Sequence, residues 1–256
     1  MPSRLKSYEL KKSNQIRTQT HINKHYSGTQ ELSDAQVGLQ QYSQDIVKKI
    51  YKRFNNANKI LDFGAGDGQL AEIWGRNFGV TPDCLEIDPH LIKILVTKKF
   101  KVFKSTADIQ ELYSFIYTSN TLEHIENDTQ ALKDIKNKMI SGGMLAIYVP
   151  ALPILFSDLD RSVGHFRRYK KVELINKVVE AGFIVEECFW NDSLGIIASI
   201  FLKMFGFKGK LGLGNRKSLI FYDRVIYPVS RILDKVLMRR IIGKNLFLFA
   251  VNPSEG

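Results

Sequence analysis

The sequence predicts an α/β fold that is doubly wound around a mostly parallel seven-stranded sheet. Two observations predict it: short apolar runs alternate with segments of helical spacing from about residue 37 to residue 190, and a glycine-rich turn joins the first apolar run to a helix. Such alternation is typical of parallel strands with right-handed crossovers and helices on both faces. A third observation, a basic segment before the last apolar run, predicts a helical insertion there.

Seven apolar runs have the length and the boundaries of strands. The expected strands are 59–63, 83–87, 100–104, 114–119, 144–149, 183–190 and 246–251. Helical spacing begins near residue 37, and helices are expected at 69–78, from Asp88 onward, at 128–139 and at 171–181. Asp88 can cap its helix, Pro89 suits the first turn, and Gly182 predicts a helix end.

Composition and charge divide the chain into three parts. Residues 1–35 are a polar, aperiodic arm, residues 36–192 with 245–252 form the predicted ligand-binding domain, and residues 193–244 are the basic insertion. The net charge is +11, but residues 203–244 carry eleven Lys or Arg against two Asp. The positive field therefore belongs to the periphery, and the chemistry is expected in a mildly acidic middle.

A hydrophobic fraction of 44% and a charged fraction of 25% exclude a largely disordered chain. Cys84 and Cys188 lie in apolar runs and are expected to be buried, reduced thiols. No apolar run follows the basic residues at the start, so no secretory signal is expected. Together these features predict a cytoplasmic location.

The glycine loop at residues 64–68 follows a predicted strand and opens a predicted helix. Glycines let a backbone turn sharply and approach a ligand closely, and open α/β sheets bind ligands beyond the carboxyl ends of their strands. Position 69 is Gln rather than the third glycine of a dinucleotide fingerprint, and no Gly-Lys-Ser/Thr follows. Asp62 disfavours a phosphate and suits a ligand with an ammonium or sulfonium. A tight turn without a ligand is the alternative.

Residues 61–68, Leu-Asp-Phe-Gly-Ala-Gly-Asp-Gly, resemble the first motif of class I S-adenosylmethionine-dependent methyltransferases, in particular the type-11-like group. The resemblance covers roughly residues 40–190 and the last strand. It implies a Rossmann-like fold and S-adenosylmethionine as the cofactor.

The resemblance also implies positions that bind this cofactor. Glu86 matches an acidic residue that binds both ribose hydroxyls, Asp108 matches one that meets the adenine amine, and residues 119–125 match a segment that lines the methionine end. The implied cofactor-binding residues are Asp62, Gly64, Ala65, Gly66, Gly68, Glu86, Ile87, Asp108, Ile109 and Asn120. Of the two acids that could cap the following helix, we expect Asp88 to do so rather than Glu86. Asp108 could instead be a helix cap, and His124 a packed core histidine.

Methyl transfer requires an aligned acceptor and, where needed, removal of its proton. The histidine and cysteine spacings predict no metal site. Residues 156–169 contain two carboxylates, one histidine, three arginines and one tyrosine. We predict His165, or less favourably His124, as the general base, because an unperturbed histidine pKa near ~6.5 suits that role. Arg167 and Arg168 are predicted to hold an anionic group of the acceptor. A solvated cluster of salt bridges is the alternative.

Residues 164–169, Gly-His-Phe-Arg-Arg-Tyr, are similar to a motif of a bacterial subset of the type-11-like group. This resemblance implies acceptors related to surface polysaccharides or lipid-linked sugars. We therefore predict an S-adenosylmethionine-dependent methyltransferase that acts on a small, glycosidic or lipid-linked acceptor. An RNA-directed methyltransferase and a non-catalytic S-adenosylmethionine-binding protein are the alternatives. Residues 119–122, Ser-Asn-Thr-Leu, lack the Pro-Pro-Tyr pattern of base-amine methylation.

In the basic insertion, apolar residues from position 222 onward fall at helical spacing with cationic residues between them. The pattern predicts either contact with an anionic membrane surface through residues 194–240 or a helical cap whose apolar stripe is buried. Binding of nucleic acid is the less favoured third interpretation. Peripheral attachment at the inner membrane face would follow from the first. The sequence defines neither the acceptor nor the oligomeric state.

Overall fold

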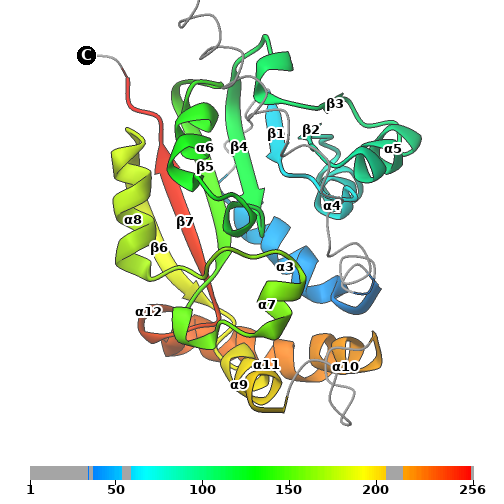
Figure 1. Cartoon of the computed structure of the whole chain (residues 1–256), viewed down its shortest axis with the longest axis vertical. Helices are drawn as coiled ribbons and strands as arrows, with labels where there is room; N and C mark the ends of the chain where they lie inside the picture. Colours follow the sequence, from blue (N-terminus) through cyan, green and yellow to red (C-terminus); the bar gives the residue numbers. More distant parts are fainter. Residues whose placement is uncertain (1–33, 35–36, 54–58, 206–215, 255–256) are drawn as a thin grey trace, which may run out of the picture.

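The computed structural model describes residues 34, 37–53, 59–205 and 216–254 (Figure 1). The predicted polar arm therefore lies outside the described residues, apart from residue 34. The seven strands form one sheet in the order β3-β2-β1-β4-β5-β7-β6. They are β1 (Ile60–Phe63), β2 (Asp83–Leu85), β3 (Val102–Phe103), β4 (Tyr113–Ser119), β5 (Met139–Pro150), β6 (Ile184–Asn191) and β7 (Asn245–Val251).

Pairing between the strands confirms the predicted, mostly parallel sheet. The strands β1 to β5 pair in parallel, and β7 lies antiparallel between β5 and β6. The carboxyl ends of β1, β2 and β4 therefore meet at one edge, and the residues that follow these strands converge there.

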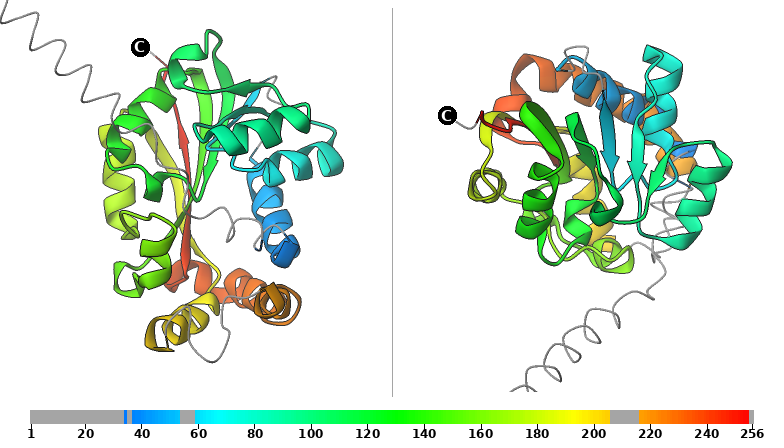
Figure 2. Two further views of the ribbon diagram at one scale, coloured as in Figure 1. Left: turned by 45° about the vertical axis from the view of Figure 1, so that its right-hand side comes forward. Right: turned by 90° about the horizontal axis from the view of Figure 1, so that it is seen from above.

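Helices cover both faces of the sheet, as the alternation predicted (Figure 2). They are α3 (Gln40–Tyr51), α4 (Gln69–Phe78), α5 (Pro89–Thr97), α6 (Asp128–Lys136) and α8 (Lys171–Glu180). Successive strand residues point to opposite faces. Leu61 packs with α6 and α8 in one core, whereas Ile60 packs with α3 and α4 in the other.

The start of β5 differs from its prediction. We expected a helix up to residue 139 and a strand from 144, but α6 ends at Lys136 and β5 begins at Met139. Tyr113 pairs with Met139 and Phe115 pairs with Met144, so a bulge absorbs the residues between. Gly142, with a φ of 74°, belongs to that bulge, and its N–H donates to the Asn252 carbonyl (2.8 Å).

The predicted insertion between β6 and β7 is helical. It contains α9 (Gly195–Phe205) and an unbroken helical run from residue 216 to residue 241, which we name the C-terminal helical segment. This segment consists of α10 (Arg216–Phe221), the π-turn η4 (Tyr222–Ile226), α11 (Tyr227–Leu233), the π-turn η5 (Asp234–Met238) and α12 (Arg239–Ile241). Figure 1 and the left view of Figure 2 place these helices together at one end of the molecule.

Candidate functional site

The glycine loop joins β1 to α4 in a backbone conformation that L-residues rarely adopt. Gly64, Gly66 and Gly68 have φ values of 80°, 59° and 84°. A Cβ at position 64 would lie 2.2 Å from Cγ2 of Thr121, which follows β4. Thr121 Oγ1 donates to the Gly64 carbonyl (3.2 Å). Because contact between the two turns is this close, position 64 requires glycine.

Glu86, directly after β2, fixes the glycine loop against the neighbouring strand end. Its buried carboxylate accepts the N–H of Gly66 (2.8 Å) on one oxygen and the N–H groups of Ile87 (2.8 Å) and Asp88 (2.9 Å) on the other. Asp88 Oδ1 accepts two N–H groups of the first turn of α5. The expectation that Asp88, and not Glu86, caps this helix is therefore confirmed.

Three buried acidic side chains surround the glycine loop: Asp62, Asp67 and Glu86. Burial raises the pKa of each of them, and that of Asp62 reaches about 7, although Tyr117 donates a hydrogen bond (2.8 Å) to its carboxylate. The Glu86 and Asp67 carboxylates raise the pKa of Asp62 further. Negative charges crowded in this way favour a cation beside them, so the loop fits a ligand that carries an ammonium or sulfonium.

The other predicted cofactor residues lie along the same edge of the sheet. Asp108 ends the short turn η1 (Thr106–Asp108) after β3, and its carboxylate accepts the Lys104 N–H (3.2 Å) rather than an N–H of a following helix. The side chain of Ile109 is buried in the core, whereas that of Ile87 is exposed. Asn120 follows β4 with a φ of 52°. The structure thus assembles the predicted set at one edge, with the Ile109 side chain turned inward.

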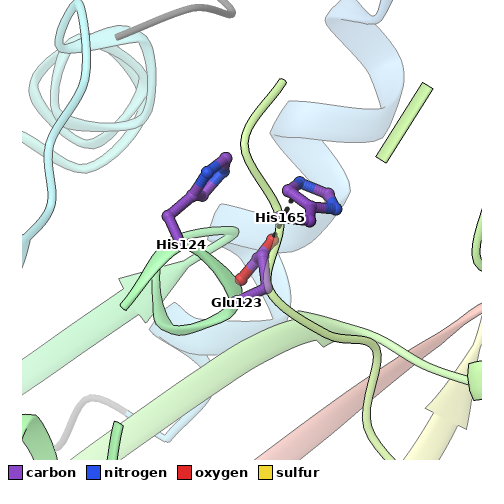
Figure 3. Close-up of side chains that lie close together, drawn as sticks. All are labelled: Glu123, His124 and His165. Carbon is purple, nitrogen blue, oxygen red and sulfur yellow. Dashed lines mark ion pairs between the residues drawn. The ribbon is translucent and has the colours of Figure 1, made fainter. Parts of the chain in front are cut away.

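A second cluster forms where the turn η2 (Leu122–His124) meets the loop that follows α7 (Asp158–Ser162). Figure 3 shows Glu123, His124 and His165 turned toward one another. The rings of the two histidines lie edge to face, with centroids 4.5 Å apart. His165 Nε2 lies 3.9 Å from Glu123 Oε1, and His165 Nδ1 lies 2.8 Å from Asp160 Oδ1. The site therefore combines the turn η2, which follows β4, with the loop at residues 156–169 that the sequence analysis singled out.

Asp160 determines which nitrogen of His165 carries the proton. Arg168 donates two hydrogen bonds (2.9 and 3.0 Å) to the Asp160 carboxylate. Ser157 donates its N–H and its hydroxyl to the same carboxylate. Burial alone would raise the pKa of Asp160, but the hydrogen bonds from His165 and Arg168 hold it well below its usual range. A charged Asp160 accepts a hydrogen bond from Nδ1–H, so in the neutral form of His165 the other nitrogen, Nε2, presents a lone pair.

Glu123 faces that lone pair from a fully buried position. Among the described residues, neither of its oxygens has a hydrogen-bond partner. Burial raises the pKa of Glu123 to about 7, against the lowering influence of His165 and Arg168. Burial, together with neighbouring His165, lowers the pKa of His124 to about 4. At neutral pH His124 is therefore uncharged, and Glu123 lies close to its titration midpoint.

The structure gives the two predicted anion-binding arginines internal partners instead. Arg168 is buried against Asp160, as described above. Arg167 contacts Asp128 (2.7 Å) and donates to the Glu126 carbonyl (2.7 Å). Both guanidinium groups therefore form salt bridges within the protein, as in the alternative that the sequence left open. Arg167 pairs with Asp128 and Arg168 with Asp160.

Glu123, His124 and His165 also offer three possible metal ligands within 4.8 Å of one another. The prediction of no metal stays a prediction. Burial raises the pKa of both cysteine thiols, to about 11 for Cys188, and neither is expected to act as a nucleophile.

Sequence reasoning underrated Asp160 and Glu123, neither of which was assigned a role. A signal existed for Asp160, because Ser157-x-x-Asp160 forms a capping box for α7. Glu123 lies within the matched segment 119–125, but its contact with His165 is made across 42 residues of chain and has no local signal.

Comparison with known proteins agrees with this geometry. Residues 36–187, more than half of the chain, match a family model described as a methyltransferase domain. No curated protein matches the chain. Among solved structures, the fold is similar to a SAM-dependent methyltransferase from Archaeoglobus fulgidus, at 15% identity and a TM-score of 0.55 over 83% of this chain and 94% of that one.

Two further solved structures with a similar fold are described as enzymes with different activities. Phosphoethanolamine N-methyltransferase 2 from Haemonchus contortus, solved with S-adenosyl-L-methionine, matches at 14% identity and a TM-score of 0.54, over 82% of this chain and 53% of that one. The chain thus spans about half the length of that enzyme. The [4+2]-cyclase SpnF matches at 12% identity and a TM-score of 0.52, over 82% of this chain and 81% of that one. At such identities the likeness describes the fold alone.

Proposed function

Because the chain belongs to the methyltransferase domain family, we propose that it methylates a hydroxyl or amine of a small, glycosidic or lipid-linked acceptor, with His165 as the general base. Family membership confirms the predicted enzyme class and its cofactor, S-adenosylmethionine. The narrower assignment, to a bacterial subset of the type-11-like group, stays part of the proposal and rests on residues 164–169.

The observation that carries the proposal is the pairing of His165 with Asp160. Asp160 holds the proton on Nδ1, so Nε2 is oriented as an acceptor. When Nε2 takes a proton from the methyl acceptor, Asp160 stabilises the imidazolium at 2.8 Å, and Glu123 does so at 3.9 Å. His124 is the weaker candidate, because a group with a pKa of about 4 is a poor base at neutral pH.

This base lies beside the proposed cofactor site. The His124 N–H donates to the Thr121 carbonyl (3.0 Å), and Thr121 contacts the glycine loop, so η2 links the two clusters within one turn. When bound, S-adenosylmethionine supplies an electrophilic methyl group on a good leaving group. The residues of this chain then need only to bind, to align the acceptor and to accept its proton.

We assign cofactor binding to the edge formed by the strand ends. Glu86 holds the glycine loop and would bind the ribose hydroxyls, and Asp108 would accept from the adenine amine. Asp62 and Asp67 favour the positive charges of the methionine end. The crowding of these three buried acids, Asp62, Asp67 and Glu86, supports this assignment, because a cationic ligand relieves it.

The acceptor is identified by transfer of a tritiated methyl group from labelled S-adenosylmethionine into lipid, polysaccharide, RNA and protein fractions of cells. We expect label in the lipid or polysaccharide fraction, and we expect His165→Ala to abolish it. His90→Ala is the matched control, because His90 is exposed on α5, away from the cluster. Label confined to RNA would contradict the acceptor class, and full labelling by His165→Ala would contradict the base.

A further inference from the structure

The C-terminal helical segment turns its polar face inward. Asp223 accepts the Gln41 and Tyr42 N–H groups at the start of α3 (2.9 and 2.8 Å). Asp234 accepts the Asp192 and Ser193 N–H groups after β6 (2.7 and 3.1 Å). Between these two anchors, Tyr227 and Ser230 are also buried and hydrogen-bonded. These hydrogen bonds, together with packing of Tyr227 in the core, hold the segment against the rest of the protein.

The opposite face of the segment is apolar and exposed. Its exposed residues are Phe221, Val225, Val229, Ile232, Leu233, Val236, Leu237 and Ile241. Surface helices of globular proteins normally bury the apolar stripe and expose the polar one. This segment does the opposite, because these apolar residues are exposed and its polar anchors are buried. The predicted cap with a buried apolar stripe is therefore wrong: the polar anchors occupy the buried face, and Val236 is 79% exposed.

The two π-turns keep the apolar residues aligned. From residue 221 to residue 241 the exposed positions recur in steps of about four, which is wider than the 3.6 residues of an α-helical turn. A pure α-helix would rotate such a stripe around its axis, whereas π-turns contain more residues per turn and reduce this drift. Both π-turns also contain an anchor, Asp223 in η4 and Asp234 in η5.

Helix α9 extends the apolar surface at the same end of the molecule. Ile197, Ile200 and Met204 of α9 are exposed. The N–H of Leu194, which precedes the helix, donates to Ser230 Oγ of the C-terminal helical segment (3.0 Å). Among the described residues, no helix is long and apolar enough to cross a membrane.

The charge exposed on the segment is entirely positive. Its two acidic residues are the buried anchors, whereas it carries seven Lys or Arg residues. Arg231 pairs with Asp45, and Arg239 pairs with Glu187. The five others have no ion pair among the described residues: Arg216, Lys217, Arg224, Lys235 and Arg240.

We propose that this surface docks the protein on an anionic phospholipid bilayer, with the apolar stripe inserted at the level of the headgroups. An apolar helix face flanked by unpaired cations matches a membrane interface, which offers acyl chains and negative charge together. A second copy would bring two positively charged faces together. RNA would satisfy the cations but leave the aliphatic stripe in water.

The proposed docking surface contacts the stretch of chain that leads to the base. Lys203 of α9 donates to the carbonyl of Ile154, in the turn η3 (Pro153–Leu155) that follows β5. The same stretch of chain continues through α7 to His165. A lipid-linked acceptor could thus reach the site from the membrane, but docking itself requires neither cofactor nor acceptor, so it can be tested apart from the proposed function.

The test is flotation of the full chain with vesicles of phosphatidylcholine alone or mixed with phosphatidylglycerol. We expect binding to the anionic vesicles only. Val236→Glu should weaken it by about tenfold or more, because about 1.5 kcal/mol of side-chain burial corresponds to about tenfold in affinity. Val172→Glu is the matched control, since Val172 is 68% exposed on α8. Lys235→Gln with Arg240→Gln should lower affinity by about fivefold for each charge removed.

Equal binding to neutral vesicles, or equal loss with Val172→Glu and Val236→Glu, would overturn the proposal. So would a dimer in light scattering that Val236→Glu dissociates while anionic vesicles fail to bind, because the stripe would then be an interface between copies. Binding of RNA without binding of vesicles, lost in the Lys235 and Arg240 variant, would overturn it in favour of nucleic acid.

Discussion

Gly64→Ala would introduce a Cβ where Thr121 leaves no room. The new atom would lie 2.2 Å from Thr121 Cγ2 and 2.4 Å from Oγ1, on a residue with a φ of 80°. The left-handed backbone costs about 1–2 kcal/mol for alanine, and overpacking of this kind costs about 1–3 kcal/mol. We therefore expect the free energy of unfolding to fall by about 2–5 kcal/mol, and the affinity for S-adenosylhomocysteine to weaken.

Two controls separate the backbone cost from the clash. Gly79 has a φ of 68° and nothing within 4 Å of an added Cβ, so Gly79→Ala should lose only the backbone cost of about 1–2 kcal/mol. In a Thr121→Gly background, Gly64→Ala should cost the same smaller amount. Chemical denaturation measures stability, and calorimetry measures ligand affinity. An equal cost of Gly64→Ala in both backgrounds, or an unchanged affinity, would refute the reasoning about the loop.

Three further predictions concern titration and metal. Because the pKa of Glu123 is raised from 4.5 to about 7 in the folded state, its contribution to stability is fully present below about 4.5 and is lost as pH rises through 7. The free energy of unfolding should fall over this window by about 3 kcal/mol more than in Glu123→Gln, and equal slopes in denaturant titrations would contradict this. The affinity for S-adenosylhomocysteine should increase from pH 6 to pH 8 as Asp62 ionises. In Asp62→Asn, calorimetry should find an affinity that does not change over this range. The same pH dependence in Asp62→Asn as in the wild type would exclude Asp62 as the cause. Treatment with EDTA should leave methyl transfer unchanged, whereas a loss that added zinc restores would assign a metal to Glu123, His124 and His165.

Local sequence rules were sufficient for the cofactor edge of the sheet. A strand, a turn with three glycines and a helix are encoded within residues 60–78, and Asp88 with Pro89 encodes the start of α5. Bulges are set by pairing across the sheet, so the start of β5 could not be placed. The pairing of Met139 with Tyr113 and the hydrogen bonds between this stretch and Asn252 define it.

Contacts between residues distant in the sequence or on different elements determine the features that the sequence predicted less well. Arg168 was expected to hold an acceptor, but its guanidinium fits the carboxylate of Asp160, eight residues earlier in the chain. Helical spacing in the C-terminal helical segment was visible, yet the pattern could not tell which face is buried. That choice depends on N–H groups at the start of α3 and after β6, which Asp223 and Asp234 satisfy.

The central claim is that His165 removes a proton from the acceptor at a site next to the bound cofactor. The most direct test measures kcat of His165→Ala on the labelled acceptor, with and without added imidazole, alongside the affinity for S-adenosylhomocysteine. We expect kcat to fall by about 10²–10⁴-fold, the affinity for S-adenosylhomocysteine to stay the same, and imidazole to restore part of the rate. An unchanged kcat, or a lost rate that imidazole does not restore in a variant that still binds S-adenosylhomocysteine, would contradict the claim.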